Sequence, residues 1–245
     1  MKFFQMSRCY LVDGVEYPRC TTILDETLER QGLIFWKVDQ AIHYALTHRK
    51  ATEREIKTAL GKVSRDGAER GSNVHDWIKR YTPGKEKYLK RLPPSYRGYC
   101  EAYVTALKEL RPTVVYREKT MISKRHGFGC TMDQKWNMAN GQSYVIDVKT
   151  GTIVPRDAIQ LAANKAAAME NGLADATTKT GLLKLHGDGR YEWIPVDVPF
   201  DLFLSVKQLW DWKQTFRTQV KEVKKLARDA KKKVHILVDK KKRRR

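Results

Sequence analysis

The stretch Gly127–Gly151, GFGCTMDQKWNMANGQSYVIDVKTG, decides the fold of this chain because its pattern predicts a β-hairpin. The first arm runs from Gly129 to Asn137 and the second from Ser143 to Lys149. In the second arm apolar side chains recur at every second residue, as in a strand with one face in a core: Tyr144, Ile146 and Val148. In the first arm a shared parity predicts three residues on one face: Cys130, Met132 and Trp136.

The loop between the arms fixes how the two strands pair. Ala139-Asn140-Gly141 is typical of a three-residue loop, a type I turn followed by a glycine with positive φ. Asp133 then lies opposite Asp147, with their Cβ atoms roughly 4.5–5.5 Å apart. The same pairing matches apolar residues across the strands: Trp136 with Tyr144, and Met132 with Val148. A two-residue turn would put the two aspartates on opposite faces, so we favour the longer loop.

Two carboxylates this close repel each other unless they share a proton or a cation. Lys149 follows Asp147 by two residues and so projects from the same face. Oxygen ligands favour Mg²⁺ or Mn²⁺ over zinc. Asp-x-Lys occurs five times in this lysine-rich chain, so the facing acid, Asp133, gives the tripeptide its weight. The alternative is a pair of edge-strand acids that face water.

An acid on one strand followed by Asp-x-Lys on the next resembles the PD-(D/E)XK nuclease superfamily. The resemblance implies a restriction-endonuclease-like α/β fold, a mixed β-sheet flanked by helices. It also implies that Asp133 and Asp147 hold one or two Mg²⁺ or Mn²⁺ ions and that Lys149 positions the attacking water.

Gly71 and His75 lie one turn apart on an expected helix from Asp66 to Tyr81, and the glycine leaves room beside the imidazole. This G-x-x-x-H spacing, upstream of the acid pair, resembles the RecB-like branch, in which the histidine faces the metal. His75 is then a third ligand, and metal affinity should fall as pH drops through about 6.5. A histidine packed in the core is the alternative.

Two further residues are candidates for the site. Gln160 lies on an expected helix from Pro155 to about Gly172, where the RecB-like branch has Gln-x-x-x-Tyr. The resemblance implies a site role for Gln160, but Asn164 stands at the tyrosine position, which puts base stacking there in doubt. Glu118, on an expected strand from Thr113 to Ile122, is either a further site acid or a partner for a basic residue.

The rest of the chain predicts one nuclease domain, 1–223, with a basic tail, 224–245. Its N-terminal part, 1–65, begins with a hairpin that turns at Asp13-Gly14, followed by a helix that Thr21-Thr22 can cap and by helices from Leu33 and from the capping box Thr52–Glu55. The core spans about 66–198, and a helix begins near 200. The segment YPRCTTIL with its following helices resembles phage-type exonucleases of the same branch.

The chain carries a net charge of +20. The segment from Lys221 to Arg245 holds 13 basic and 3 acidic residues, so half of the excess lies in residues 1–220. An excess spread over body and tail favours nucleic acid as partner. We expect the tail to contact DNA phosphates through Lys231, Lys232, Lys233, Lys240, Lys241, Lys242, Arg243, Arg244 and Arg245.

Other classes are disfavoured. No apolar run approaches the roughly 20 residues of a membrane span, and no signal-peptide pattern is present. The four cysteines lack Cys-x-x-Cys spacing, so we expect reduced thiols in a cytoplasmic protein. The Gly-rich segments lack phosphate-loop spacing, which excludes a nucleotide cofactor, and Lys149-Thr150-Gly151 has no accompanying Ser-x-x-Lys nucleophile.

These observations predict a metal-dependent DNA nuclease, foremost an exonuclease of recombination, replication or repair. A structure- or sequence-specific endonuclease, such as a junction resolvase, and a catalytically inactive DNA-binding module are the alternatives. Protein partners and oligomeric state stay open.

Overall fold

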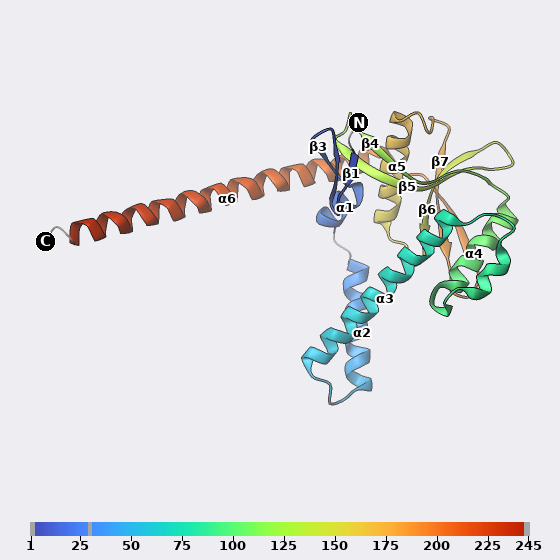
Figure 1. The fold of residues 1–245 in the computed structure, drawn as a ribbon, viewed down its shortest axis with the longest axis horizontal. Coiled ribbons are helices and arrows are strands. Elements are labelled where there is room, and N and C mark those ends of the chain that lie inside the picture. Colours follow the sequence, from blue (N-terminus) through green and yellow to red (C-terminus); the bar gives the residue numbers. More distant parts are fainter. Residues whose placement is uncertain (1–2, 29–30, 243–245) are drawn as a thin grey trace.

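The computed structural model describes residues 3–28 and 31–242 and has an α/β architecture (Figure 1). A five-stranded sheet has the order β4-β5-β6-β7-β8, and a three-stranded antiparallel sheet has the order β1-β2-β3. The large sheet consists of β4 (Thr113–Ser123), β5 (Phe128–Asn137), β6 (Ser143–Lys149), β7 (Lys179–Leu185) and β8 (Tyr191–Val196). The small sheet consists of β1 (Phe3–Gln5), β2 (Cys9–Val12) and β3 (Val15–Pro18). The large sheet is mixed because β6 and β7 run parallel.

Helices connect and cover these strands: α1 (Cys20–Thr27), α2 (Gln31–Thr47), α3 (Glu53–Arg80), the 3₁₀ helix η1 (Glu86–Arg91), α4 (Pro94–Leu110), α5 (Pro155–Glu170) and α6 (Phe200–Lys242). The capping box at Thr52 is confirmed, and the helix that it opens continues without a break through His75. The predicted threonine cap of α1 is wrong. That helix begins at Cys20, and its N-cap residue, Arg19, makes no side-chain cap.

The predicted hairpin loop is confirmed. Gly141 has φ +80°, and Met138 and Gln142 are linked by a backbone hydrogen bond of 2.9 Å. Trp136 pairs with Tyr144 as expected, but the β5–β6 ladder ends at Gln134 and Ile146. The aspartates lie one position beyond it. There the Val148 N–H donates to the Asp133 Oδ2 at 2.8 Å, so the Asp133 carboxylate takes the place of a backbone carbonyl as the next acceptor along the two strands.

The large sheet is covered on both faces. One core lies under α1, α5 and α6, with Met132, Val145 and Leu182 from the strands. The other lies under α3 and α4, with Trp136, Ile146, Val148 and Leu183 from the strands. Two expectations are therefore wrong: β6 buries both faces, and Cys130 and Met132 do not share a core with Trp136.

The two cores also rule out the expected match of Met132 with Val148, because the two side chains lie in different cores. The side chains of β5 change from one core to the other at the level where β4 is irregular. Arg117 pairs with Gln134 and Lys119 pairs with Met132, but Glu118 between them has φ +49°. Because this residue leaves the extended conformation, the period-two pattern does not continue through it.

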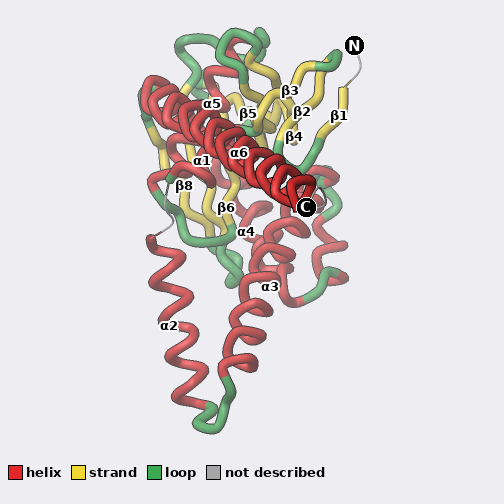
Figure 2. Tube along the Cα trace, turned by 90° about the vertical axis from the view of Figure 1, so that its left-hand side faces the viewer, coloured by secondary structure: helices red, strands yellow, loops and turns green. Residues whose placement is uncertain are grey.

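Two helical projections extend from the sheets. Helices α2 and α3 run side by side away from the large sheet, and the C-terminal half of α6 leaves the body in another direction (Figures 1 and 2). Helix α6 continues to Lys242, past the end expected near Asp229. The described side chains from Lys221 to Ala230 are all exposed.

All nine side chains of the tail that are predicted to contact phosphates lie outside the described part of the structure. This holds for residues Arg243, Arg244 and Arg245 and for the side chains of Lys231, Lys232, Lys233, Lys240, Lys241 and Lys242. Among the described helices, none combines the length and apolar character that crossing a membrane requires. The four cysteines are free thiols.

Candidate active site

The irregularity in β4 brings two acids together. In the β4–β5 register Glu118 falls opposite Asp133, but the regular pairing skips both. A positive φ at a residue with a Cβ costs roughly 1–2 kcal/mol and persists only where the surroundings impose it. Here it directs the Glu118 carboxylate toward the same space as Asp133. Glu118, which the sequence left between two interpretations, therefore lies in the site.

His75 points into this space from α3. Its Nδ1 is 3.3 Å from the Glu118 Oε1 and 3.8 Å from the Asp133 Oδ2. Its Nε2 is 3.1 Å from the Val148 carbonyl oxygen, to which it donates. Ligand atoms of His75, Glu118 and Asp133 lie within 4.8 Å of one another, close enough to share one metal ion. The imidazole is thus turned toward the acids and not into the core.

Asp147 lies beside this group, at the end of β6. It is 1% exposed, and the Gln160 Nε2 on α5 donates to its Oδ1 at 3.1 Å. Its Oδ2 is 2.9 Å from the Lys149 Nζ. The predicted Asp147, Lys149 and Gln160 are therefore in direct contact, although strand β6 and helix α5 contribute them separately.

Asp157 is a site residue that the sequence analysis did not single out. It lies in the first turn of α5, is 6% exposed, and places its Oδ1 3.2 Å from the Lys149 Nζ. Its signal in the sequence is the presence of an acid two residues after Pro155, at the third helical position. In the structure this carboxylate accepts from the Val154 N–H at 2.9 Å. That pattern indicates a helix cap, and nothing in it points to Lys149.

The acids perturb one another and the groups beside them. Burial raises the pKa of Asp133 to about 7, the Asp147 carboxylate adds to the rise, and His75 opposes it. Burial also raises the pKa of Asp147, which Lys149 holds down in part. Burial lowers the pKa of His75, but Asp133 and Glu118 raise it by more, to about 9. Without a metal ion, His75 is therefore protonated at neutral pH and provides positive charge among these carboxylates.

Lys149 is similarly stabilised as a cation. Burial lowers its pKa, but the carboxylates of Asp147 and Asp157 outweigh that effect and leave the pKa above its ordinary value. Its side chain is 23% exposed, so the ammonium group keeps access to the cavity while two carboxylates hold it. The lysine is thus a fixed positive charge and hydrogen-bond donor.

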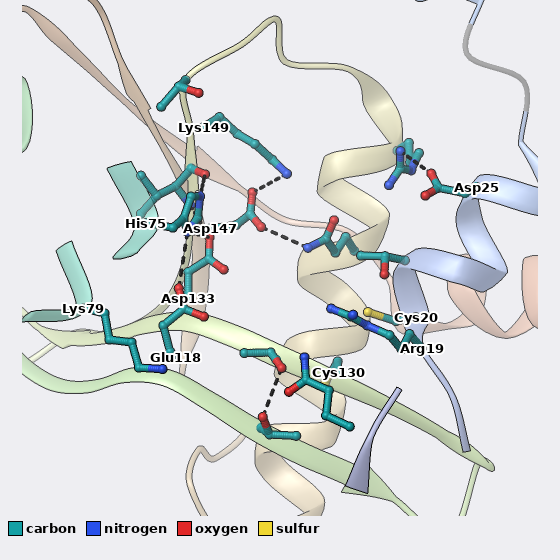
Figure 3. A pocket seen from close by; sticks show the side chains of 18 of the residues that line it. Arg19, Cys20, Asp25, His75, Lys79, Glu118, Cys130, Asp133, Asp147 and Lys149 are labelled. Carbon is teal, nitrogen blue, oxygen red and sulfur yellow. Dashed lines mark hydrogen bonds and ion pairs between the residues drawn. The ribbon is translucent and has the colours of Figure 1, made fainter. Parts of the chain in front are cut away.

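These residues line a cavity of about 550 Å³, in which the side chains of His75, Glu118, Asp133 and Asp147 converge (Figure 3). The small sheet and α1 form another part of its wall. Basic side chains also line it: Arg19, Lys79 and Arg156, the last of which is paired with Asp25 at 2.6 Å. The cavity combines an acidic floor, suited to a metal ion, with cationic groups suited to phosphate.

Two details of the structure bear on Asn164 and Gly71. Asn164 is fully buried, with the Cys20 Sγ 3.9 Å from its Oδ1, so it cannot stack on a base. A Cβ added at Gly71 would meet the Thr150 Oγ1 at 3.6 Å, an ordinary contact. The neighbour of this glycine is therefore Thr150, and a methyl group has room there.

No protein-family model matches the chain, and no curated protein matches it. Among solved structures, it is similar to the crystal structure of SSO0001, with a TM-score of 0.39 and 12% sequence identity. That similarity covers 81% of this chain and 76% of the other.

Proposed function

We propose that this chain is a metal-dependent DNA nuclease of the PD-(D/E)XK superfamily, in its RecB-like branch, and acts foremost as an exonuclease. The observation that carries the proposal is the convergence of His75, Glu118 and Asp133 within 4.8 Å, beside the paired Asp147 and Lys149. The mixed sheet, with a parallel β6–β7 pair joined through α5, supports a restriction-endonuclease-like fold.

The donor set fits Mg²⁺ or Mn²⁺. Two carboxylates and one imidazole nitrogen surround one space, and the buried Asp147 supplies a further carboxylate. His75 uses Nε2–H to bond the Val148 carbonyl, which leaves Nδ1 as the ligand atom and fixes the orientation of the ring. When bound, the metal would neutralise charge on the scissile phosphate and acidify a water molecule.

The residues of the chain then have separate roles. Lys149 donates a hydrogen bond from the cavity wall and so orients the water or a phosphate oxygen. Gln160 holds Asp147 through the Oδ1 contact of 3.1 Å and fixes the direction in which that carboxylate points. Arg19 and Lys79, which line the cavity, are placed to bind the phosphates of the flanking nucleotides.

The direct test is digestion of end-labelled linear and closed circular DNA, single- and double-stranded, with Mg²⁺ and with EDTA. An exonuclease degrades the linear forms from an end and leaves closed circles intact, whereas an endonuclease also nicks the circles. Asp147→Asn is the matched variant and should abolish cleavage. Cleavage in EDTA, or near wild-type cleavage by Asp147→Asn, contradicts the site assignment, and Mg²⁺-dependent DNA binding without cleavage would indicate an inactive module.

A further inference from the structure

The ammonium group of Lys149 lies between two carboxylates from different elements. Its Nζ is 2.9 Å from the Asp147 Oδ2 and 3.2 Å from the Asp157 Oδ1. An ammonium group has three N–H donors, so two carboxylate partners leave one donor for a molecule in the cavity. A lysine side chain has four rotatable bonds and keeps a single orientation only where its head group is held.

Asp157 is built to hold that head group. Its Oδ2 accepts from the Val154 N–H at 2.9 Å, which fixes the carboxylate at the start of α5 and turns Oδ1 toward Lys149. One turn along the same helix, Gln160 reaches the other oxygen of Asp147. The first turns of α5 thus hold both Lys149 and Asp147.

We propose that Asp157 is the positioning residue of Lys149, orienting the lysine so that its third N–H donor points into the cavity. This inference rests on the proposed function, because the donor matters only if water or phosphate is its target. Without Asp157, the lysine keeps only Asp147 of these two partners and gains rotational freedom. A displacement of about 1 Å in a catalytic group can cost on the order of 100-fold in rate.

Asp157→Asn separates positioning from helix capping. The Val154 N–H and Lys149 contact different oxygens of Asp157, and an amide has oxygen at only one of these two places, so it can serve one partner but not both. We expect it to keep the cap, because an amide NH₂ facing the fixed backbone N–H would leave two donors in contact, whereas the flexible lysine can move away from the NH₂. The variant should therefore fold, with a kcat lower by about 10- to 100-fold and with KM for DNA and half-saturating Mg²⁺ changed less than about twofold.

Asp175→Asn is the matched control. Asp175 also accepts backbone N–H groups, from Thr177 at 3.0 Å and Thr178 at 2.9 Å, but it is not among the residues that line the cavity. Its variant should keep the wild-type kcat. If Asp157 only capped the helix, both asparagine variants would retain full activity, and that result overturns the inference.

A second variant shows whether Asp157 acts through Lys149. Once Lys149→Ala has removed the lysine, adding Asp157→Asn should lower kcat by less than about twofold, because two residues that act as one unit are non-additive. If the two substitutions instead lower kcat by independent factors that multiply in the double variant, the positioning role is contradicted.

Crystal structures of the wild type and Asp157→Asn provide a readout that needs no activity. The Lys149 Nζ should lie beside both carboxylates in the wild type and should leave this place or become disordered in the variant. An unmoved Nζ overturns the inference even if the wild type cleaves no DNA. Absence of cleavage by the wild type, together with a displaced Nζ, instead contradicts the proposed function and leaves the Asp157–Lys149 link standing.

Discussion

Replacing Asp133 by Asn should stabilise the metal-free protein at alkaline pH, although it removes a proposed metal ligand. The carboxylate is held beside Asp147 and Glu118, and burial raises its pKa from 3.8 to about 7. Asparagine keeps an oxygen that can accept from the Val148 N–H, and it never ionises. The substitution therefore removes the unfavourable charge and preserves the hydrogen bond.

The size of the effect follows from the pKa. Between pH 3.8 and about 7 the folded protein holds a proton on Asp133 that the unfolded chain releases, so the unfolding free energy of the wild type falls as pH rises through this window. At 1.36 kcal/mol per pH unit, the ionised carboxylate costs up to about 4 kcal/mol at pH 8. The pKa of about 7 already includes the attraction of protonated His75, which opposes the rise. Asp133→Asn should therefore match the wild type near pH 4 and exceed its stability at pH 8.

Urea unfolding in EDTA, followed by circular dichroism from pH 4 to pH 9, measures this difference. Asp175→Asn is the control of opposite sign, because hydrogen bonds from Thr177 and Thr178 lower the pKa of Asp175 and its variant should lose stability at pH 8. Mg²⁺ should stabilise the wild type more than Asp133→Asn. If Asp133→Asn is no more stable than the wild type at pH 8 in EDTA, burial and repulsion do not destabilise the ionised Asp133 carboxylate, and the reasoning is refuted.

Three further predictions concern the metal and the DNA. His75→Ala should raise the Mn²⁺ concentration for half-maximal cleavage at least about tenfold, with excess Mn²⁺ restoring part of the rate. Lost thermal stability without rescue would instead assign His75 a structural role only. The affinity for Mn²⁺, measured by calorimetry, should increase from pH 6 to pH 9. Metal binding needs His75 neutral, with a pKa of about 9, and Asp133 ionised, with a pKa of about 7. A constant affinity above pH 7 would contradict this prediction. Truncation before Lys224 should weaken DNA binding and reduce its salt slope by roughly 0.7–0.9 per lost contact, whereas slower turnover at saturating DNA with unchanged affinity would assign the tail to the active site.

The hairpin register could be predicted from the sequence because its determinants are local. The Ala139-Asn140-Gly141 loop sets which residues face each other, as the Trp136–Tyr144 pair confirms, but alternation did not predict which core each β5 side chain enters. The contact of Asp147 with Lys149, two residues apart on β6, follows from the same periodicity. Chemistry carried by neighbouring residues on one strand or loop is therefore readable without a structure.

The remainder of the site depends on long-range packing. Nothing in the residues around Glu118 indicates its positive φ, and nothing in β5 indicates that its side chains change from one core to the other at the same level of the sheet. Asp157 carries the pattern of a helix cap, and its second contact, to Lys149, exists only because α5 begins beside the end of β6. The pKa of His75 lies above the ordinary value of about 6.5 for a similar reason, because acids 43 and 58 residues away in the chain raise it.

The protonation of His75 links the stability of the site to its proposed chemistry. Three acids packed this closely need positive charge, and in the metal-free protein His75 and Lys149 provide it. A divalent ion that enters between His75, Glu118 and Asp133 must displace the proton on Nδ1, because the same lone pair binds either the proton or the metal. Lys149 has no such conflict, since its contacts to Asp147 and Asp157 do not require it to lose a proton. In the proposed mechanism the two cations therefore have different roles: His75 would exchange its charge for that of the metal, and Lys149 would keep its charge throughout.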